Sequence, residues 1–425
     1  MTDFRLLTDP SPEAALPRPV TRRQFMKQST LLAISAAIGA HIPFGRFLPE
    51  GLIPVALAQT PGLQRYGKHA GLMVLGDSPF VAETPAHLLD DEVTPVEYLF
   101  VRNNGLPPAE DTIDPAKWTL LIDGESVKNP TQLTLDGLKS KFRAVTQHLV
   151  LECAGNGRSE FFPPAKGSPW TTGGVGFPEW TGVRLGDVLR AAGIKDDAVY
   201  IGYYGKDTHL SGDTTKPVIS RGVPISRALE DGALIAWAMN GKDLPWVHGY
   251  PLRLVVGGAP GSASGKWLMR IAIRNRVHDG PKMGEHDYRL PCEPLAPGEP
   301  SDNYCVLEEM PVKSLVTFPQ SGTKHPLGKG LTVRGQAWTS TKDVSAVHLS
   351  IDFGQTWMPT KLAGARNRYG PQRFATAVSF PKKGYYEIWA RATDDKGRAQ
   401  PMVVPGWNAG GYGSNACHRI AVRIV

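Results

Sequence analysis

The stretch Leu149–Phe161 reads LVLECAGNGRSEF and combines an apolar run, a cysteine, a turn flanked by glycines and an arginine. The apolar run predicts a short buried strand that ends at Cys153. Glycines on both sides of Asn156 let the backbone approach a bulky ligand, because they carry no Cβ. Arg158 is a planar, permanently charged donor for an oxyanion. Cys153 is therefore a metal ligand or a nucleophile, or else an ordinary small buried side chain.

The first 58 residues have the pattern of a twin-arginine export signal. Paired arginines lie in Thr21–Lys27 (TRRQFMK), an apolar stretch covers Leu31–Ile42, and Ala56–Ala58 provides a small-x-small cleavage site. The apolar stretch is well below the ~20 residues that a membrane span needs. We therefore predict a periplasmic protein that is exported folded, with no membrane span in the mature chain. Export in the folded state also favours a bulky non-haem cofactor.

Composition favours a strand-rich protein of two or three domains. The chain of 425 residues holds 46 Gly and 37 Pro, which indicates many turns and short strands rather than a helical bundle. Its formal net charge is +7, and the leader holds six basic and four acidic residues, so the mature chain would keep +5. This balance is compatible with an anionic substrate or an acidic partner. No basic block with interleaved aromatic residues points to nucleic acid.

A proline-rich break at Pro291–Pro300 divides the mature chain. Beyond it the sequence alternates apolar and polar residues in short runs, which is typical of an antiparallel sandwich of immunoglobulin type. Such runs cover residues 347–351, 386–390 and 420–424. We therefore predict three segments: a leader at 1–58, a larger domain at 59–310 and an immunoglobulin-like domain at 311–425.

The four cysteines are Cys153, Cys292, Cys305 and Cys417. In an oxidising compartment four cysteines can form two disulfides, but a metal ligand at Cys153 leaves one of the others unpaired. Cys292 and Cys305 bracket the proline-rich break and are the expected pair. The sequence contains neither a CxxCH motif nor a cysteine cluster, so the chain has no haem c or iron–sulfur centre of its own.

Strands and short helices alternate before the break. Strands are predicted at Val96–Val101, Trp118–Ile122, Leu234–Met239 and Leu252–Val256, and helices at Leu133–Phe142 and Leu185–Ala192. The dipeptide at Asn240–Gly241 predicts a hairpin turn between the last two strands. After the last strand, Gly257–Trp267 (GGAPGSASGKW) is suited to hold a phosphate through backbone N–H groups and a lysine, but its spacing differs from that of an ATP-binding loop.

Four motifs in this order resemble the sulfite oxidase family of molybdenum enzymes. The family's CAGNRR motif stands here as CAGNGR at Cys153–Arg158, its HG(Y/F)PxR motif as His248–Arg253, its Lys-Trp phosphate loop as Lys266–Trp267, and its C-terminal WN motif as Trp407–Arg419. The resemblance covers essentially all of the mature chain. It implies an α+β protein in which a mixed α/β molybdopterin domain of sulfite oxidase type precedes an immunoglobulin-like sandwich.

The resemblance also implies roles for individual residues. Cys153 would bind molybdenum through its thiolate, beside the dithiolene of molybdopterin. The other residues that would hold the cofactor are Asn103, Asn104, Asp213, His248, Arg253, Ser264, Gly265 and Lys266. The residues that match the family's oxyanion pocket are Arg102, Arg158, Trp170 and Tyr288.

Two departures from the family pattern bear on the substrate. Asn104 stands where the family usually has a histidine, and Gly410 stands where sulfite oxidases have a third substrate arginine. A glycine there predicts a wider and less positive pocket, which would bind free sulfite less tightly. This pattern resembles the Sox branch of the family, whose molybdenum subunit oxidises protein-bound sulfane sulfur in thiosulfate oxidation.

The resemblance implies partners as well. Electrons would leave to a c-type cytochrome subunit, the substrate would be presented by a sulfur-carrier protein, and the C-terminal domain would form a homodimer. Two alternatives stay open from the sequence. One is a sulfite dehydrogenase of the same fold that acts on free sulfite. The other is a non-catalytic exported interaction protein on an immunoglobulin-like scaffold.

Overall fold

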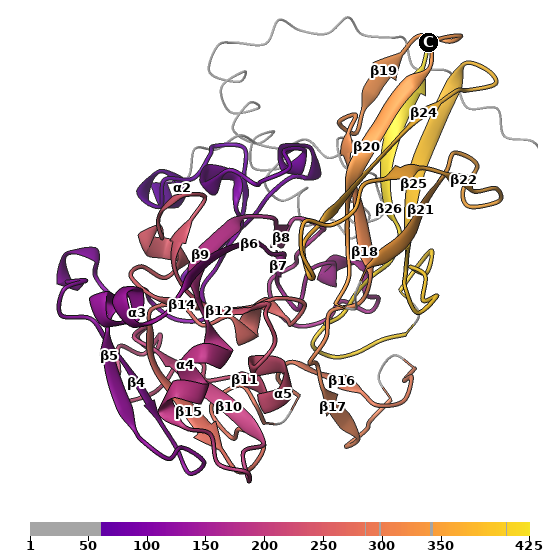
Figure 1. Ribbon diagram of the computed structural model, residues 1–425. Helices are drawn as coiled ribbons and strands as arrows, with labels where there is room; N and C mark the ends of the chain where they lie inside the picture. The colour runs from indigo at the N-terminus through magenta and orange to yellow at the C-terminus, as the bar shows by residue number, and fades with distance from the viewer. Residues whose placement is uncertain (1–60, 285, 297–298, 341–342, 405) are drawn as a thin grey trace, which may run out of the picture.

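The computed structural model describes residues 61–284, 286–296, 299–340, 343–404 and 406–425, which form two lobes (Figure 1). The larger lobe runs from α2 to β15, and an elongated lobe holds β18 to β26, coloured orange to yellow. The predicted leader at 1–58 lies outside the described residues. Among the helices that the structure describes, none has the length and apolar character of a membrane span.

Three sheets frame the larger lobe. The first joins β1 (Met73–Asp77), β2 (Phe80–Glu83) and β3 (Val101–Arg102). The second has the order β11–β10–β15–β4–β5, with bounds β4 Thr119–Asp123, β5 Thr131–Thr134, β10 Tyr200–Gly205, β11 Gly222–Pro224 and β15 Leu268–Arg274. The third has the order β13–β12–β9–β6, and β14 also pairs with β12; the bounds are β6 Ala144–His148, β9 Glu179–Arg184, β12 Ala233–Met239, β13 Lys242–Asp243 and β14 Arg253–Val256.

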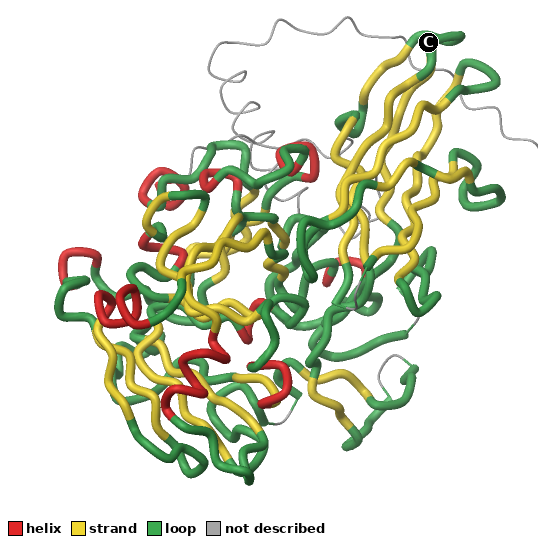
Figure 2. The backbone as a smooth tube through the Cα atoms, in the orientation of Figure 1, coloured by secondary structure: helices red, strands yellow, loops and turns green. Residues whose placement is uncertain are grey.

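Among the residues that the structure describes, helices are few and short, and strands and loops dominate the backbone (Figure 2). The α-helices are α2 Pro61–Arg65, α3 Leu135–Lys141, α4 Leu185–Ala192 and α5 Ile225–Ala228. The 3₁₀ turns are η2 Ala86–Leu89, η3 Val96–Tyr98, η4 Glu110–Thr112, η5 Arg158–Glu160, η6 Trp246–His248 and η7 Gly261–Ala263. Both predicted helices are confirmed. Thr134 caps α3 by accepting from the Gly137 N–H, and Gly193 ends α4 with a φ of 78°.

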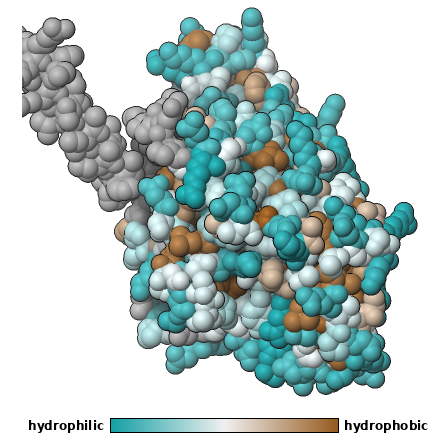
Figure 3. Space-filling view, turned by 90° about the vertical axis from the view of Figure 1, so that its left-hand side faces the viewer, coloured by the Kyte–Doolittle hydropathy of each residue, from teal (hydrophilic) through white to brown (hydrophobic). Residues whose placement is uncertain are grey.

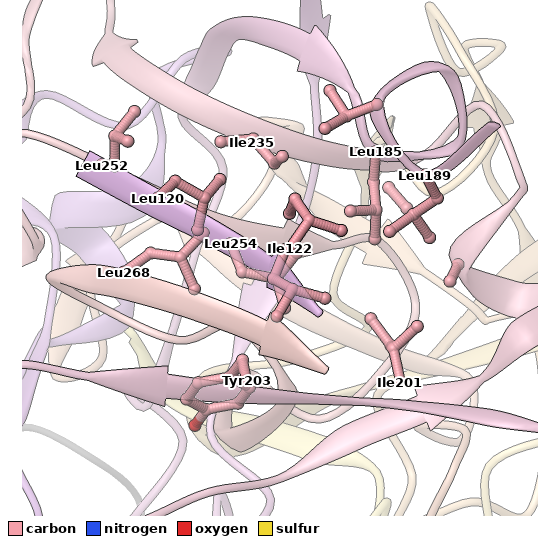
Figure 4. Packing of buried hydrophobic residues seen from close by; sticks show 14 of the residues in the cluster. Leu120, Ile122, Leu185, Leu189, Ile201, Tyr203, Ile235, Leu252, Leu254 and Leu268 are labelled. Atoms are coloured by element: carbon pink, nitrogen blue, oxygen red, sulfur yellow. The ribbon is translucent and has the colours of Figure 1, made fainter. Parts of the chain in front are cut away.

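The core of the larger lobe joins the second sheet, the third sheet and α4 (Figure 4). Leu120 and Ile122 of β4, Leu189 of α4, Ile235 of β12 and Leu254 of β14 all belong to one fully buried cluster. Burying these side chains is the main favourable contribution to the stability of the lobe. Because β14 and β15 are both anchored in this core, the loop between them, residues 257–267, has fixed ends.

The second lobe is a sandwich of two sheets around its own apolar core. One sheet has the order β18–β20–β24–β23, with bounds β18 Lys313–Phe318, β20 Leu331–Trp338, β23 Lys361–Leu362 and β24 Gln372–Val378. The other has the order β19–β26–β25–β21–β22, with bounds β19 Thr323–His325, β21 Val344–Ser350, β22 Met358–Pro359, β25 Gly384–Asp394 and β26 His418–Ile424. The predicted α+β class is confirmed. On the face in Figure 3, hydrophobic residues lie in small groups among hydrophilic ones.

Two strand predictions need correction. Val96–Val101 was predicted as one strand, but Pro95 precedes the 3₁₀ turn η3, and only Val101 and Arg102 pair as β3. The turn at Asn240–Gly241 is present, with positive φ at both residues. It joins β12 to β13, however, and not to β14. Strand β14 pairs with the N-terminal part of β12, residues 233–236. A local pattern identifies a strand but not which strand it pairs with, since pairing depends on the fold.

A short hairpin links the two lobes. Strands β16 (Arg289–Pro291) and β17 (Tyr304–Val306) pair, and a disulfide joins Cys292 to Cys305 beside them. The predicted cysteine pair is thus confirmed. Cys153 and Cys417 are free and buried.

A buried ion pair connects the sandwich to the stretch at residues 149–161, which contains Cys153. The apolar run at 149–151 forms only the short strand β7 (Leu151–Glu152), which pairs with β8 (Val175–Gly176). The Glu152 side chain, 2% exposed, accepts from Lys313 Nζ at 2.6 Å and from Trp338 Nε1 at 2.8 Å. The residue before Cys153 is therefore held by two residues of the other lobe.

We expect Lys313→Met to lower the free energy of unfolding by about 3–5 kcal/mol, because it leaves the Glu152 carboxylate buried without its cation. The double variant Glu152→Gln/Lys313→Met removes both charges and should recover most of that loss. Urea denaturation followed by fluorescence measures both variants. If the double variant is as unstable as the single one, the ion pair does not carry the effect.

Candidate active site

A cavity opens beside Cys153 in the larger lobe. Its wall combines side chains from β3, β10, β14 and η6 with the loops that follow β7 and β14. The lining residues are Phe100, Arg102, Asn104, Leu151, Cys153, Ala154, Tyr203, Asp207, Ile219, His248, Arg253, Gly261, Ser262, Ser264, Gly265, Lys266, Trp267 and Tyr288. Nine of the thirteen residues predicted for the site are among them, so segments far apart in the sequence meet as predicted.

Backbone and side-chain hydrogen bonds fix Cys153 at the cavity wall. Its N–H donates to the Gly174 carbonyl at 2.8 Å, and its own carbonyl accepts from the Asn156 N–H at 2.9 Å. The Asn156 side chain donates to Glu152 at 3.0 Å and accepts from the Gly174 N–H at 3.0 Å. The turn after Cys153 is thus ordered from both sides, and the thiol is presented by a fixed backbone.

The loop after β14 brings small groups and a cation to the cavity. The Ser264 hydroxyl accepts from the Val256 N–H at 3.0 Å, which closes the loop onto its own strand. A Cβ at Gly265 would overlap the Tyr203 ring, so this position requires glycine. The next residue, Lys266, donates to the Val247 carbonyl at 3.0 Å and to the Asn103 side chain. Asn103 therefore acts behind the wall, by positioning Lys266.

Two more buried cations meet at His248. Arg253 Nη1 donates to the His248 carbonyl at 3.0 Å, while Arg253 Nε is buried and has no hydrogen-bond partner in the described part of the chain. Lys68 Nζ lies 2.5 Å from His248 Nε2. Lys68 belongs to a stretch without clear periodicity, and nothing in its local sequence pointed to the site.

The cations at this end of the cavity outnumber the carboxylates. Burial lowers the pKa of Lys68 to about 7 and that of Arg253 to about 10, and it lowers the pKa of Lys266 well below its ordinary value. Burial also raises the pKa of Asp207, which lines the same cavity, to about 6, although Lys266 opposes that shift. A bound anion would offset the cost of burying these cations.

Arg102 and Tyr288 meet at Asn104 on another part of the wall. Arg102 Nη2 donates to Asn104 Oδ1 at 2.9 Å, and the Tyr288 hydroxyl donates to the same oxygen at 3.4 Å. The asparagine that replaces the family's histidine thus connects the cation and the phenol. In the described residues no group of three or more His, Cys, Asp or Glu is placed to hold a metal, so Cys153 would bind a metal whose other ligands come from a cofactor.

Four of the predicted residues lie away from the cavity wall, and Asn103, which positions Lys266, is one of them. Asp213 sits on an exposed loop, where it accepts from Thr215 and pairs with Lys216, and Asp207 is the carboxylate that reaches the cavity. Trp170 is completely buried and packs edge-on against Phe100, so it supports the wall from behind.

Arg158 is the fourth predicted residue that does not line the cavity. Its guanidinium donates from Nε to the Gly410 carbonyl and from Nη1 to the Ser168 carbonyl, each at 2.8 Å. The ring of Tyr412 lies between Arg158 and Tyr288, 5.3 Å from the Arg158 guanidinium carbon and 5.1 Å from the Tyr288 ring centre.

The prediction that Gly410 widens the pocket is wrong for this structure. A Cβ at Gly410 would overlap the Tyr412 ring, so the space beside the glycine is filled by that ring. A pocket less positive than that of a sulfite oxidase is still expected, because no arginine stands at 410. Comparison of position 410 with the family motif showed that an arginine is missing there. It did not show that the ring of Tyr412, two positions later, fills the space.

Comparisons with known proteins agree with this site. Residues 106–282 match an oxidoreductase molybdopterin binding domain and residues 304–425 a Mo-co oxidoreductase dimerisation domain. Sulfite oxidase of Gallus gallus is 34% identical over 88% of this chain and 83% of its own length, and the mitochondrial sulfite oxidase of Mus musculus is 32% identical over 91% and 72%. The solved sulfane dehydrogenase SoxCD of Paracoccus pantotrophus is 25% identical, with a TM-score of 0.68 over 88% of this chain and 93% of that one. The chain therefore belongs to the sulfite oxidase family and is a molybdopterin enzyme that acts on sulfur groups.

Proposed function

We propose that this protein is an exported sulfane dehydrogenase subunit that oxidises sulfane sulfur held on a carrier protein during thiosulfate oxidation. The observation that carries the proposal is the likeness to the solved sulfane dehydrogenase SoxCD, which extends over 88% of the chain. The absence of an arginine at position 410 supports it, because a site with fewer cations is less selective for a free oxyanion.

The residues of the cavity fit the cofactor of the family. Lys266, Arg253 and Ser264 would hold the phosphate of molybdopterin, and the unpartnered Arg253 Nε offers it a donor. Cys153 would bind the metal as thiolate. When bound, molybdenum supplies two-electron redox chemistry and oxygen transfer at sulfur.

The chain's own groups bind and orient the sulfur substrate. Arg102, held by Asn104, offers its guanidinium to an anionic sulfur group in the cavity. The Tyr288 hydroxyl belongs to the same hydrogen-bonded set and can donate to an oxygen of the product. Tyr203 and Trp267 close the wall, with Trp267 almost fully buried, and limit the access of water.

The proposal includes partners and a compartment. Since the sequence has no haem c or cluster motif, two electrons from each turnover must leave to another protein, and we propose a c-type cytochrome subunit in the periplasm. The match of residues 304–425 to a dimerisation domain supports a homodimer. Membership in an enzyme family argues against a non-catalytic interaction protein.

A second candidate is oxidation of free sulfite, which is favoured by the 34% identity to a sulfite oxidase. Steady-state assays with a c-type cytochrome as acceptor separate the two. We expect turnover with the persulfide form of a carrier protein, and a KM for free sulfite at or above ~1 mM, the upper end of the usual range. Rapid turnover of sulfite with a low micromolar KM would favour sulfite dehydrogenase.

Cys153→Ser should abolish turnover, because a hydroxyl is a poor substitute for a thiolate ligand of a soft metal. Turnover and molybdenum content of the purified variant measure this. Cys417→Ser is the matched control, since Cys417 is also free and buried but does not line the cavity. Retained activity in Cys153→Ser would contradict the assignment of the ligand.

Cofactor retention should decrease as pH rises from about 5 to 8. The raised pKa of Asp207, about 6, means that its carboxyl is neutral below this value and gains a negative charge above it, while Lys68, with a pKa of about 7, loses its positive charge. Both changes weaken binding of an anion. Molybdenum retained after gel filtration at a series of pH values measures the effect, and Asp207→Asn should remove the part near pH 6. An identical profile for the variant would exclude Asp207.

A further inference from the structure

Four side chains form a continuous stack beside the cavity. The guanidinium carbon of Arg221 lies 4.5 Å from the centre of the Tyr288 ring, and the Tyr288 and Tyr412 rings stack at 5.1 Å with planes inclined by 19°. The Arg158 guanidinium completes the stack on Tyr412. Tyr288 lines the cavity, whereas Tyr412 and Arg158 do not. The Tyr412 ring therefore lies between the Arg158 guanidinium and the Tyr288 ring, which lines the cavity.

The loop of the second lobe holds the Tyr412 ring in this place. The Asn408 side chain accepts from the Tyr412 N–H at 2.9 Å and donates to the Tyr412 carbonyl at 3.1 Å. Gly410 provides the room for the ring, because any Cβ there would overlap it. Gly411 and Gly413 have positive φ, which L-side chains rarely adopt. The position of the ring is thus a property of the loop, not of a free side chain.

Arg221, at the other end of the stack, packs against the Tyr288 ring. Arg221 is 1% exposed, and its Nη1 donates to the hydroxyl of Ser262, a residue of the cavity wall, at 2.8 Å. In the described residues no carboxylate lies within salt-bridge distance of Arg221; Glu308, which acts on it at longer range, accepts instead from the Tyr200 hydroxyl. Two cations therefore flank the two phenol rings, which is favourable for both.

Arg158 keeps a donor that the protein does not use. Its Nε and Nη1 are bonded to carbonyl groups, but Nη2 makes no hydrogen bond with the described residues. Arg158 as a whole is nearly buried, at 7% exposure. Such a group would bind an oxyanion strongly if the cavity reached it.

We propose that Tyr412 is a specificity-determining residue that shields Arg158 from the substrate, so that Arg102 is the guanidinium offered to an anionic sulfur group. This inference rests on the proposed function and names the residue behind its selectivity. A compact oxyanion such as sulfite gains most from a second guanidinium, because its oxygens can each accept. A sulfur group on a carrier protein depends less on it. The shield therefore disfavours free sulfite relative to a tethered sulfane sulfur.

The test compares Tyr412→Ala, which removes the ring, with Tyr412→Phe, which keeps it, in the holoenzyme. Sulfate is the probe, measured as a competitive inhibitor, together with KM and kcat for sulfite. We expect Tyr412→Ala to bind sulfate at least about tenfold more tightly, the size of one charge-assisted hydrogen bond, and to lower the KM for sulfite more than it changes kcat. Tyr412→Phe should behave like the wild type in sulfate affinity.

The double variant Tyr412→Ala/Arg158→Gln tells whether Arg158 causes the gain. We expect the gain in sulfate affinity to disappear, which a merely structural effect of removing the ring would not produce. Equal sulfate affinity in Tyr412→Ala and Tyr412→Phe, or a gain that persists without Arg158, would overturn the inference. If Tyr412→Ala loses molybdenum, Tyr412→Leu is assayed under the same criteria.

The outcome can be separated from that of the proposed function. The wild-type KM for sulfite tests the proposed sulfane dehydrogenase function. The ratio of sulfate affinities between Tyr412→Ala and Tyr412→Phe tests whether Tyr412 shields Arg158. A wild type that acts on carrier-bound sulfur but shows a ratio near one would refute the shield alone. A tenfold ratio in an enzyme that already oxidises sulfite with low KM would refute the proposed function alone.

Discussion

The arrangement of the site depends on one buried carboxylate, that of Glu152. It accepts from Lys313 and Trp338 of the sandwich, and from Asn156 of the turn after Cys153. Lys313 also donates to the Asn156 carbonyl at 3.2 Å. A buried ion pair is not by itself favourable, but here every partner is satisfied and each one fixes a different segment. The thiol of Cys153 therefore has its position only when both lobes are in place.

Electrostatics explains why the cavity needs a resident anion. Lys68, Lys266 and Arg253 are all desolvated, which lowers the pKa of each, and Lys266 and Arg253 line the cavity together with the carboxylate of Asp207. Without an anion these cations repel one another at low dielectric, so the folded protein tolerates them poorly. A phosphate held by Lys266 and Arg253 would convert this cost into affinity. The same imbalance makes the cavity selective for negatively charged ligands in general.

Sequence patterns predicted the parts of the site that are local. Three contiguous motifs supply these parts: the turn at Cys153–Arg158, the motif at His248–Arg253 and the loop ending at Lys266. Each combines a short strand with glycine or proline, and such combinations can be recognised in a sequence without a structure. The residues of the site that the sequence did not predict are placed there by packing. Lys68 has no local pattern, and Asp207 lies in the same loop as Asp213, which was the carboxylate predicted for the site. Which of the two carboxylates reaches the cavity is decided by the path of the loop after β10.

The second lobe does more than provide a surface for dimerisation. Its C-terminal loop contributes the Gly410 carbonyl that accepts from Arg158 and the Tyr412 ring that stacks on Tyr288. Its first strand contributes Lys313, so the turn from Cys153 to Arg158 is held by the sandwich at both ends. An exchange of sandwich domains between relatives would thus alter the chemistry of the site and not only the assembly. If Tyr412 shields Arg158 as proposed, selectivity can change through the loop of one lobe while Cys153 in the other lobe stays the same.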